Sequence, residues 1–193
     1  MLTAELLERA LADAGKCVSS DGKSPQALHA ARSRAWVKCL GEQLRALCSE
    51  PDVRVFCKSD DCNREEFGLN ELLYDVCVCR TETCSSARGT KTLRYVTKAL
   101  WLVESEFARN SYEAVKDFNK LVIGAAENKL FVGPRLGERE EAQYLEALLP
   151  VARCSAEHGA NVWLAMVAHP DAWGEAGVGV KLSRIDGDAW RTL

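Results

Sequence analysis

Two glutamates separated by one residue, Glu104 and Glu106, follow a run of apolar residues in the segment ALWLVESEF. Residues 93–107 are predicted to form a β-strand, on which alternate side chains point to the same face. The two carboxylates would then lie about 7 Å apart, since each residue advances a strand by about 3.3 Å. Like charges at that separation on a half-buried surface are costly unless a metal ion or a lysine compensates them.

A third acid lies in the preceding apolar segment, LLYDVCV, where Asp75 is predicted to belong to a strand over residues 72–79. Glu71 precedes it by four residues and would lie on the same side. If the two strands are neighbours, Asp75 and Glu104 converge at one edge of the sheet. Carboxylate oxygens are the ligands that Mg²⁺ and Mn²⁺ prefer. The sequence therefore predicts a Mg²⁺ or Mn²⁺ site built from Asp75, Glu104 and Glu106, with Glu71 as a further candidate.

The clearest helix of the chain begins at Ser111, because the apolar residues behind it recur at helical spacing. Lys116 and Lys120 lie roughly opposite Phe118 on this helix, away from its apolar face, and Asp117 flanks that face. A long lysine stem can still bend toward the edge of a sheet. Lys120 is therefore a candidate catalytic residue, and Lys116 is a second candidate.

The elements that must position these side chains follow from apolar periodicity and from Gly and Pro positions. The pattern predicts helices over 2–15, 25–48, 138–159 and from 111; strands over 53–58, 72–79, 93–107, 129–134 and 161–169; a polar loop over 81–92; and a hairpin around 186–188. Strands separated by helices are usually joined by parallel crossovers. We expect an α/β fold with a mixed central sheet flanked by helices. Residues 1–193 would form one domain, with 1–50 as N-terminal helices and 171–193 as a C-terminal extension.

This order of elements resembles the PD-(D/E)xK restriction-endonuclease-like superfamily over residues 63–168. Asp75 matches the first acid of that family, although no proline precedes it, and Glu104 matches the second. Glu106 stands where the usual family pattern has a lysine. Some branches instead have Glu-x-Glu on the strand and a basic residue on the following helix, and Lys120 in DFNKL is similar to that arrangement.

The resemblance implies a restriction-endonuclease-like fold and a metal-dependent nuclease that hydrolyses phosphodiester bonds in DNA. Asp75 and Glu104, with the backbone carbonyl of Ser105, would hold Mg²⁺ or Mn²⁺. Lys120 would orient the attacking water or stabilise negative charge that develops on the phosphate. Glu106 would hold a second metal ion or fix the lysine.

Composition limits the other classes of function. The hydrophobic content of 47% allows a sizeable core, and the formal net charge of −3 gives no sign of a nucleic-acid coat protein. No apolar run approaches the roughly 20 residues that span a bilayer, and acids occupy the N-terminal segment where a signal peptide has an apolar core. The nine cysteines are odd in number and scattered, as reduced thiols would be. We expect a cytoplasmic protein with DNA as its partner and no membrane partner, and a homodimer is left open.

Two other functions compete with the nuclease. Because Glu106 replaces the usual lysine, the chain could be a catalytically inactive interaction module on the same fold. A zinc-stabilised binding protein is the other alternative, with four thiolates around one ion. Its ligands would be Cys57, Cys62, Cys79 and Cys84.

Structural explanations compete as well. Glu104 and Glu106 could lie on the solvated face of an edge strand, paired with Lys98 or Arg109. Lys116 and Lys120 could be ordinary solvated helix positions. The three histidines lie far apart in sequence and show no metal-binding spacing: His29, His158 and His169.

Overall fold

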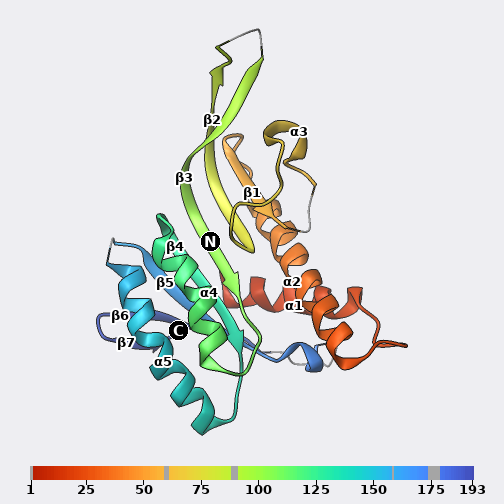
Figure 1. Cartoon of the computed structure of the whole chain (residues 1–193), viewed down its shortest axis with the longest axis vertical. Coiled ribbons are helices and arrows are strands. Elements are labelled where there is room, and N and C mark those ends of the chain that lie inside the picture. The colour runs from red at the N-terminus through yellow and green to blue at the C-terminus, as the bar shows by residue number, and fades with distance from the viewer. Residues whose placement is uncertain (1, 59–60, 88–90, 158, 174–178) are drawn as a thin grey trace.

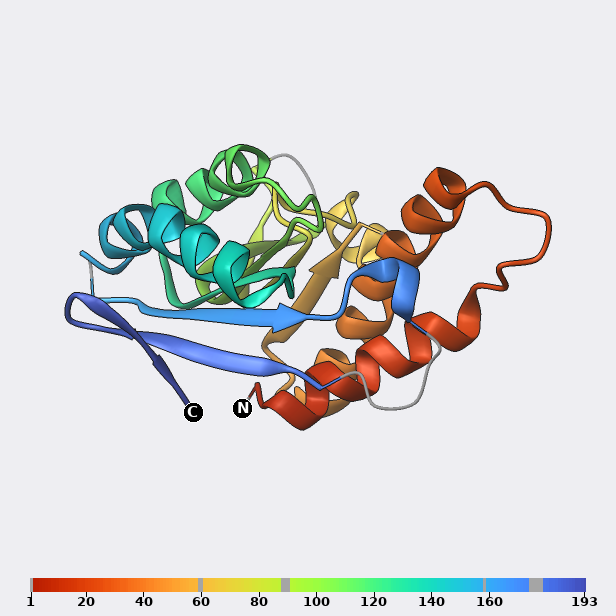
Figure 2. The same cartoon turned by 90° about the horizontal axis from the view of Figure 1, so that it is seen from below.

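A computed structural model gives the structure of the chain and describes residues 2–58, 61–87, 91–157, 159–173 and 179–193. A mixed seven-stranded sheet runs through these residues, and its strands lie side by side in the order in which they occur in the chain. Helices cover both faces of the sheet (Figures 1 and 2). The predicted α/β class, a mixed sheet flanked by helices, is confirmed.

The described elements follow the predicted order closely. The strands are β1 (Val53–Cys57), β2 (Val76–Ser85), β3 (Thr92–Ser105), β4 (Ala126–Pro134), β5 (Asn161–Val167), β6 (Lys181–Asp186) and β7 (Ala189–Thr192). The helices are α1 (Ala4–Cys17), α2 (Pro25–Leu47), α3 (Arg64–Phe67), α4 (Ser111–Ile123), α5 (Glu138–Ala156) and the 3₁₀ helix η1 (Pro170–Ala172). Side-chain oxygens cap three of them, since Thr3, Ser24 and Asn110 accept hydrogen bonds from the first turns of α1, α2 and α4.

The pairing of the strands explains why the sheet is mixed. β1, β2 and β3 pair in antiparallel fashion, and β3, β4 and β5 pair in parallel. Helices α4 and α5 are the crossovers between the parallel strands, as the alternation of strands and helices predicts. The hairpin β6–β7 extends the same sheet in antiparallel fashion. Because β3 and β4 are parallel, the chain must return from the end of β3 to the start of β4. Helix α4 makes this connection, so it follows the end of β3.

The core consists of two layers, one on each face of the sheet. Helices α1 and α2 pack on one face, where Leu11, Trp36 and Leu40 belong to the same buried cluster as Val103 of β3. Helices α4 and α5 pack on the other face, where Phe118 stacks on Phe131 of β4. Neighbouring residues of a strand therefore face different helices.

Residues 81–92 were predicted to form a loop, and this prediction is wrong for residues 81–85 and 92; residues 86, 87 and 91 lie outside the strands, and 88–90 are outside the described residues. β2 continues to Ser85 and β3 begins at Thr92, so the two strands form a long hairpin arm. Figure 1 shows this arm projecting beyond the rest of the molecule. Both of its faces are largely exposed, and residues 81–85 are mostly polar, so the apolar alternation of a half-buried strand is missing there.

Two predicted strand boundaries also need correction. The predicted strand over 72–79 begins later, at Val76, so Asp75 immediately precedes β2. Leu73, two residues earlier, has a positive φ of 49°, which an extended strand does not have. The predicted strand over 93–107 ends at Ser105, and Glu106 therefore follows β3.

Helix α2 packs closely on β1 at Gly41. A Cβ atom at this position would lie 2.8 Å from Cys57 Sγ and 3.2 Å from Cys57 Cβ. Cys57 is fully buried, so its short side chain has little room to move. The missing side chain at Gly41 therefore sets the distance between α2 and the sheet.

We expect Gly41→Ala to lower the free energy of unfolding by about 1–2 kcal/mol, because overpacking against Cys57 outweighs the better helix propensity of alanine. The measurement is urea denaturation of the two proteins. In a Cys57→Ala background the sulfur is gone but the tight contact with the Cβ atom of residue 57 remains, so Gly41→Ala should destabilise the protein less than in wild type. Equal destabilisation in both backgrounds would show that the contact with Cys57 does not control this position.

Candidate functional site

The register between β2 and β3 brings Asp75 to the end of β3. Val76 is opposite Val103 in the antiparallel ladder, so the chain just before β2 lies beside Glu104 and Ser105. Asp75 Oδ2 accepts two hydrogen bonds from Ser105, at 2.9 Å from the backbone nitrogen and 2.5 Å from Oγ. The first two predicted acids are therefore neighbours, and Ser105 fixes the orientation of the Asp75 carboxylate.

Glu104 is the most deeply buried acid of this region, with 1% of its surface exposed. Its Oε2 atom accepts a hydrogen bond from Lys120 Nζ at 3.0 Å, while its Oε1 atom is buried and has no hydrogen-bond partner among the described residues. Burial, followed by the charge of Asp75, raises the pKa of Glu104 to about 8 despite the opposing effect of Lys120. The carboxylate is therefore only partly charged near neutral pH.

Lys120 reaches the site from the last turn of α4. Its ammonium lies 3.0 Å from Glu104 Oε2 and 3.0 Å from Asp117 Oδ1, with 44% of the side chain exposed. Burial lowers the pKa of Lys120, but its hydrogen bonds to these two acids outweigh that effect and raise the pKa above the usual value. The lysine therefore stays charged, and its long stem reaches the acids although the helical wheel points it away from the apolar face.

Glu106 follows β3, where the backbone turns toward α4. Its Oε1 atom accepts a hydrogen bond from the backbone nitrogen of Ala108 at 2.6 Å. Burial raises the pKa of Glu106. The hydrogen bond from the Ala108 N–H lowers this pKa, whereas a hydrogen-bonding contact with Asp117 raises it further. Glu106 thus shares a partner, Asp117, with Lys120.

Lys120 therefore contacts two acids, Glu104 and Asp117, and each of these interacts with one more acid. We refer to Asp75, Glu104, Glu106 and Asp117 as the acid cluster. Burial also raises the pKa of Asp75, against the two hydrogen bonds from Ser105. Asp117 was not among the predicted site residues, although its place beside the apolar face of the helix was visible in the sequence. One ammonium does not neutralise four carboxylates, so the cluster favours bound protons or a bound cation.

Two members of the acid cluster, Asp75 and Glu106, line a cleft of about 430 Å³ at the end of the sheet, whereas Glu104 is buried behind them. Asp75, Ser105 and Glu106 line its acidic side. Helix α2 and the end of β1 form the opposite wall, with three basic side chains: His29, Arg34 and Lys58. A ligand in this cleft would meet carboxylates on one side and cations on the other.

The other predicted candidates lie apart from the acid cluster. Glu71 is exposed and does not line the cleft. Lys116 Nζ lies 2.7 Å from Glu113 Oε2 and 5.5 Å from the centre of the Tyr112 ring, on the exposed side of α4. Lys116 is therefore a solvated helix residue, whereas Lys120 is not.

The structure excludes the interpretation of the two glutamates as a solvated edge-strand face. β3 lies in the interior of the sheet between β2 and β4, and Glu104 is buried. Lys98, the suggested partner, forms its ion pair with Glu127 of β4. The interpretation was wrong because it depended on β3 being an edge strand.

The four-cysteine zinc site is also excluded by the fold. Cys57 is buried in the layer that packs against α1 and α2, whereas Cys79 is buried in the layer on the other face of the sheet. Cys79 Sγ instead lies 3.0 Å from Cys77 Sγ, on the same face of the sheet. Thiolates on opposite faces of one sheet cannot share a tetrahedral ion.

Comparison of the chain with models of known protein families, with curated proteins and with solved structures found no match. Within the described ranges, no helix has both the length and the apolar character that are needed to cross a bilayer. The function must therefore be argued from the residues of the site itself.

The raised pKa of Glu104 predicts how stability depends on pH. Since the pKa is about 8 in the folded chain and 4.5 in the reference state, folding takes up a proton between these values. The resulting stability is fully present below pH 4.5 and is lost as the pH rises through about 8. We therefore expect the free energy of unfolding to fall across this window, and Glu104→Gln to reduce the fall.

Urea denaturation at several pH values within this window measures the effect. Glu113→Gln is the control, because Glu113 pairs with Lys116 on the exposed side of α4. Identical pH dependence in wild type and Glu104→Gln would contradict the assigned titration.

Proposed function

We propose that the protein is a divalent-cation-dependent nuclease that hydrolyses phosphodiester bonds in DNA, on a restriction-endonuclease-like version of the α/β fold. The observation that carries this proposal is the acid cluster, in which Glu104 is buried against Asp75 and contacts a lysine from the following helix. The resemblance to the PD-(D/E)xK superfamily rests on these residue types at these places. Cytoplasmic location stays a prediction from the sequence, and a homodimer is left open.

The donor atoms of the cluster suit Mg²⁺ or Mn²⁺, which take oxygen ligands. The buried Oε1 atom of Glu104 has no hydrogen-bond partner in the described part of the chain, and the carboxylates exceed the lysine in charge. The ligating atoms of Asp75, Glu104 and Glu106 do not all lie within 4.8 Å of one another. Mg²⁺ often uses only one or two carboxylates and keeps its waters. Asp75 and Glu104 would therefore hold the ion, with Glu106 beside them.

Such an ion would supply positive charge to the phosphate and lower the pKa of a bound water. The chain's own residues have separate tasks. Ser105 holds the Asp75 carboxylate in place through two hydrogen bonds. Lys120, whose pKa is raised by Glu104 and Asp117 although burial opposes it, keeps its proton. It therefore stabilises negative charge on a phosphate and does not act as a base.

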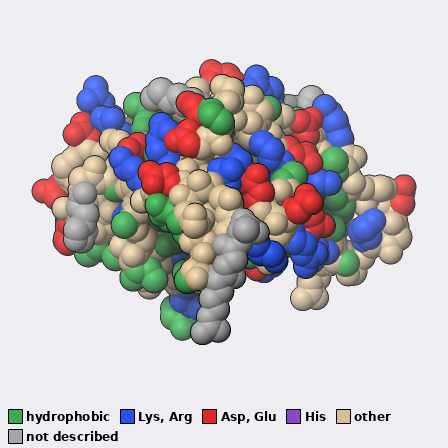
Figure 3. All heavy atoms as spheres, turned by 90° about the horizontal axis from the view of Figure 1, so that it is seen from above, with side chains coloured by type: hydrophobic (Ala, Val, Ile, Leu, Met, Phe, Trp, Pro, Cys, Tyr) green, Lys and Arg blue, Asp and Glu red, His purple; other side chains and the backbone are tan. Residues whose placement is uncertain are grey.

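The basic wall of the cleft supports a phosphate-bearing substrate. Arg34 and Lys58 lie opposite the acid cluster, and both side chains are exposed. Figure 3 shows that acidic and basic side chains alternate over the face that carries the hairpin arm, so no single charge dominates that view. With a net charge of −3, attraction of DNA depends on local groups such as these, since bound phosphates must be neutralised by nearby cations.

A second candidate is the catalytically inactive interaction module. Two observations favour it: the ammonium of Lys120 already lies between Glu104 and Asp117, and Glu106 is tied to the Ala108 nitrogen. In this alternative the lysine replaces a metal ion, and the cleft only binds its partner. The two candidates differ in whether cation-dependent cleavage occurs.

We expect wild-type protein to cleave DNA in the presence of Mg²⁺ or Mn²⁺, and Lys120→Gln to reduce the rate by roughly 10²–10³-fold. Lys116→Gln is a matched control, because it removes the same group one turn earlier, where it contacts only the exposed side of α4. Asp75→Asn should abolish cation-dependent cleavage. The measurement is cleavage of single-stranded and duplex DNA by identically purified proteins.

Three results would decide against the nuclease. Absence of cleavage by wild type under all cation conditions would support the interaction module. Equal activity of Lys120→Gln and Lys116→Gln would remove the lysine from the mechanism. Undiminished activity of Asp75→Asn would place any activity outside the acid cluster.

The basic wall gives a separate prediction. We expect Arg34→Ala and Lys58→Ala to weaken DNA binding and to make its salt dependence shallower by about one unit for each phosphate that is no longer neutralised. Lys38→Ala is the control, because Lys38 lies on the same helix but pairs with Glu42 away from the cleft. Affinity measured at several salt concentrations tests this, and equal salt slopes for all four proteins would contradict it.

A further inference from the structure

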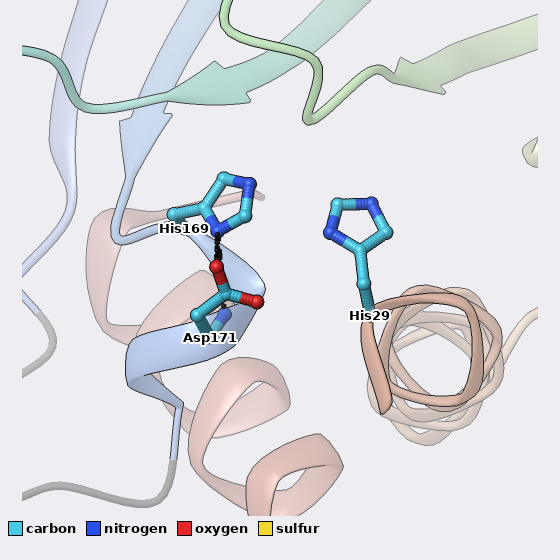
Figure 4. Close-up of side chains that lie close together, drawn as sticks. All are labelled: His29, His169 and Asp171. Carbon is cyan, nitrogen blue, oxygen red and sulfur yellow. Dashed lines mark hydrogen bonds and ion pairs between the residues drawn. The ribbon is translucent and has the colours of Figure 1, made fainter. Parts of the chain in front are cut away.

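Two histidines that are distant in sequence lie next to each other beside the cleft, with their rings tilted by 47°. His29 is on the second turn of α2, and His169 lies between β5 and η1. Their ring centroids are 5.1 Å apart. Asp171 completes the group, because one ligating atom from each of the three residues lies within 4.8 Å of the others. Figure 4 shows the His29 ring turned toward His169 and Asp171.

The backbone of this group is held in place by protein contacts. Arg32, which is buried on α2, donates through Nη1 to the carbonyl oxygens of Pro170 at 2.5 Å and Asp171 at 2.9 Å. Trp173 Nε1 donates to the carbonyl oxygen of Ala168 at 2.6 Å. The segment around His169 is therefore anchored to the helix that carries His29, so the three side chains are arranged before any ligand binds.

The side chains within the group are also oriented. His169 Nδ1 lies 2.9 Å from Asp171 Oδ2, as the dashed line in Figure 4 marks. A carboxylate beside an imidazole fixes the orientation of the ring, as in many metal sites. Atoms at this separation can also bind one ion as adjacent ligands, since bonds from zinc to nitrogen and oxygen are about 2.0–2.2 Å long.

We propose that His29, His169 and Asp171 form a binding site for a divalent transition-metal ion of the zinc type. Two imidazoles and one carboxylate suit Zn²⁺, Co²⁺ or Ni²⁺, whereas the acid cluster offers only oxygen ligands. Three protein ligands leave a coordination position open for water or a ligand. Because His29 also lines the cleft, the ion would lie at its rim. The inference does not depend on nuclease activity.

A purely structural role explains part of the same geometry. His169 Nδ1 lies 3.4 Å from the backbone nitrogen of Asp171 and caps η1 through this contact. Capping of η1 explains why His169 lies next to Asp171. It does not explain why His29, which belongs to α2, lies next to both of them. The experiment must therefore show that His29 and His169 act on the same ion.

The test is titration of the full, reduced chain with Co²⁺, followed by visible absorption, and with Zn²⁺, followed by calorimetry. We expect one ion to bind with nitrogen and oxygen ligands, and the affinity to fall about tenfold or more in both His29→Gln and His169→Gln. Glu42→Gln removes an exposed carboxylate from the same helix and should change nothing. An Asp75→Asn/Glu104→Gln variant should retain the ion, which separates this site from the acid cluster.

Several results would overturn the proposal. Intense thiolate-to-cobalt bands would assign the ion to cysteines, and unchanged affinity in both histidine variants would reduce the group to a helix cap. Loss of the ion in the Asp75→Asn/Glu104→Gln variant would assign it to the acid cluster. If a histidine variant fails to fold, Asp171→Asn carries the test, because that side chain is 55% exposed and its replacement disturbs little packing.

Discussion

The buried carboxylate of Glu104 is the constraint on which the site depends. A carboxyl group with 1% of its surface exposed cannot keep its charge without a nearby cation, and its pKa of about 8 shows that Lys120 supplies only part of what is needed. The neighbouring acids Asp75 and Asp117 raise the pKa of Glu104 further, because their negative charges disfavour a charged Glu104. A purely structural core would have little reason to bury an oxygen of Glu104 without a hydrogen-bond partner among the described residues, since an apolar residue of similar volume would be at least as stable.

The two strands that pair with β3 determine which residues surround Glu104. Its antiparallel partner β2 supplies Asp75 just before the ladder begins, and its parallel partner β4 requires a crossover, which is α4. The crossover covers the face of the sheet onto which Glu104 points, and Lys120 in its last turn reaches back to the carboxylate. The topology thus brings together residues from three segments, and a change of strand order would separate them.

The sequence predicted those parts of the structure that depend on local patterns. Helical periodicity predicted α4, and the alternation of strands and helices predicted the parallel crossovers. The hairpin arm was missed because residues 81–85 are mostly polar, and an arm exposed on both faces has no apolar alternation to detect. Asp117 was left out because a helical wheel does not show that Glu106 and Lys120 both approach it. The histidine group was missed since His29 and His169 meet only through the packing of η1 on α2, and that contact has no signature in sequence spacing.

Helix α2 connects the two candidate ion sites, because it carries His29 and also Arg34 on the wall that faces the acid cluster. The two sites differ in donor chemistry: carboxylate oxygens in one, imidazole nitrogens with one carboxylate in the other. Hard ions such as Mg²⁺ favour the first set and zinc-type ions favour the second, so the two sites need not compete for the same metal. A phosphate in the cleft would then lie between two centres of positive charge, and Arg34 and Lys58 would only need to position it. This division explains how a chain with a net negative charge could bind an anionic substrate next to four carboxylates.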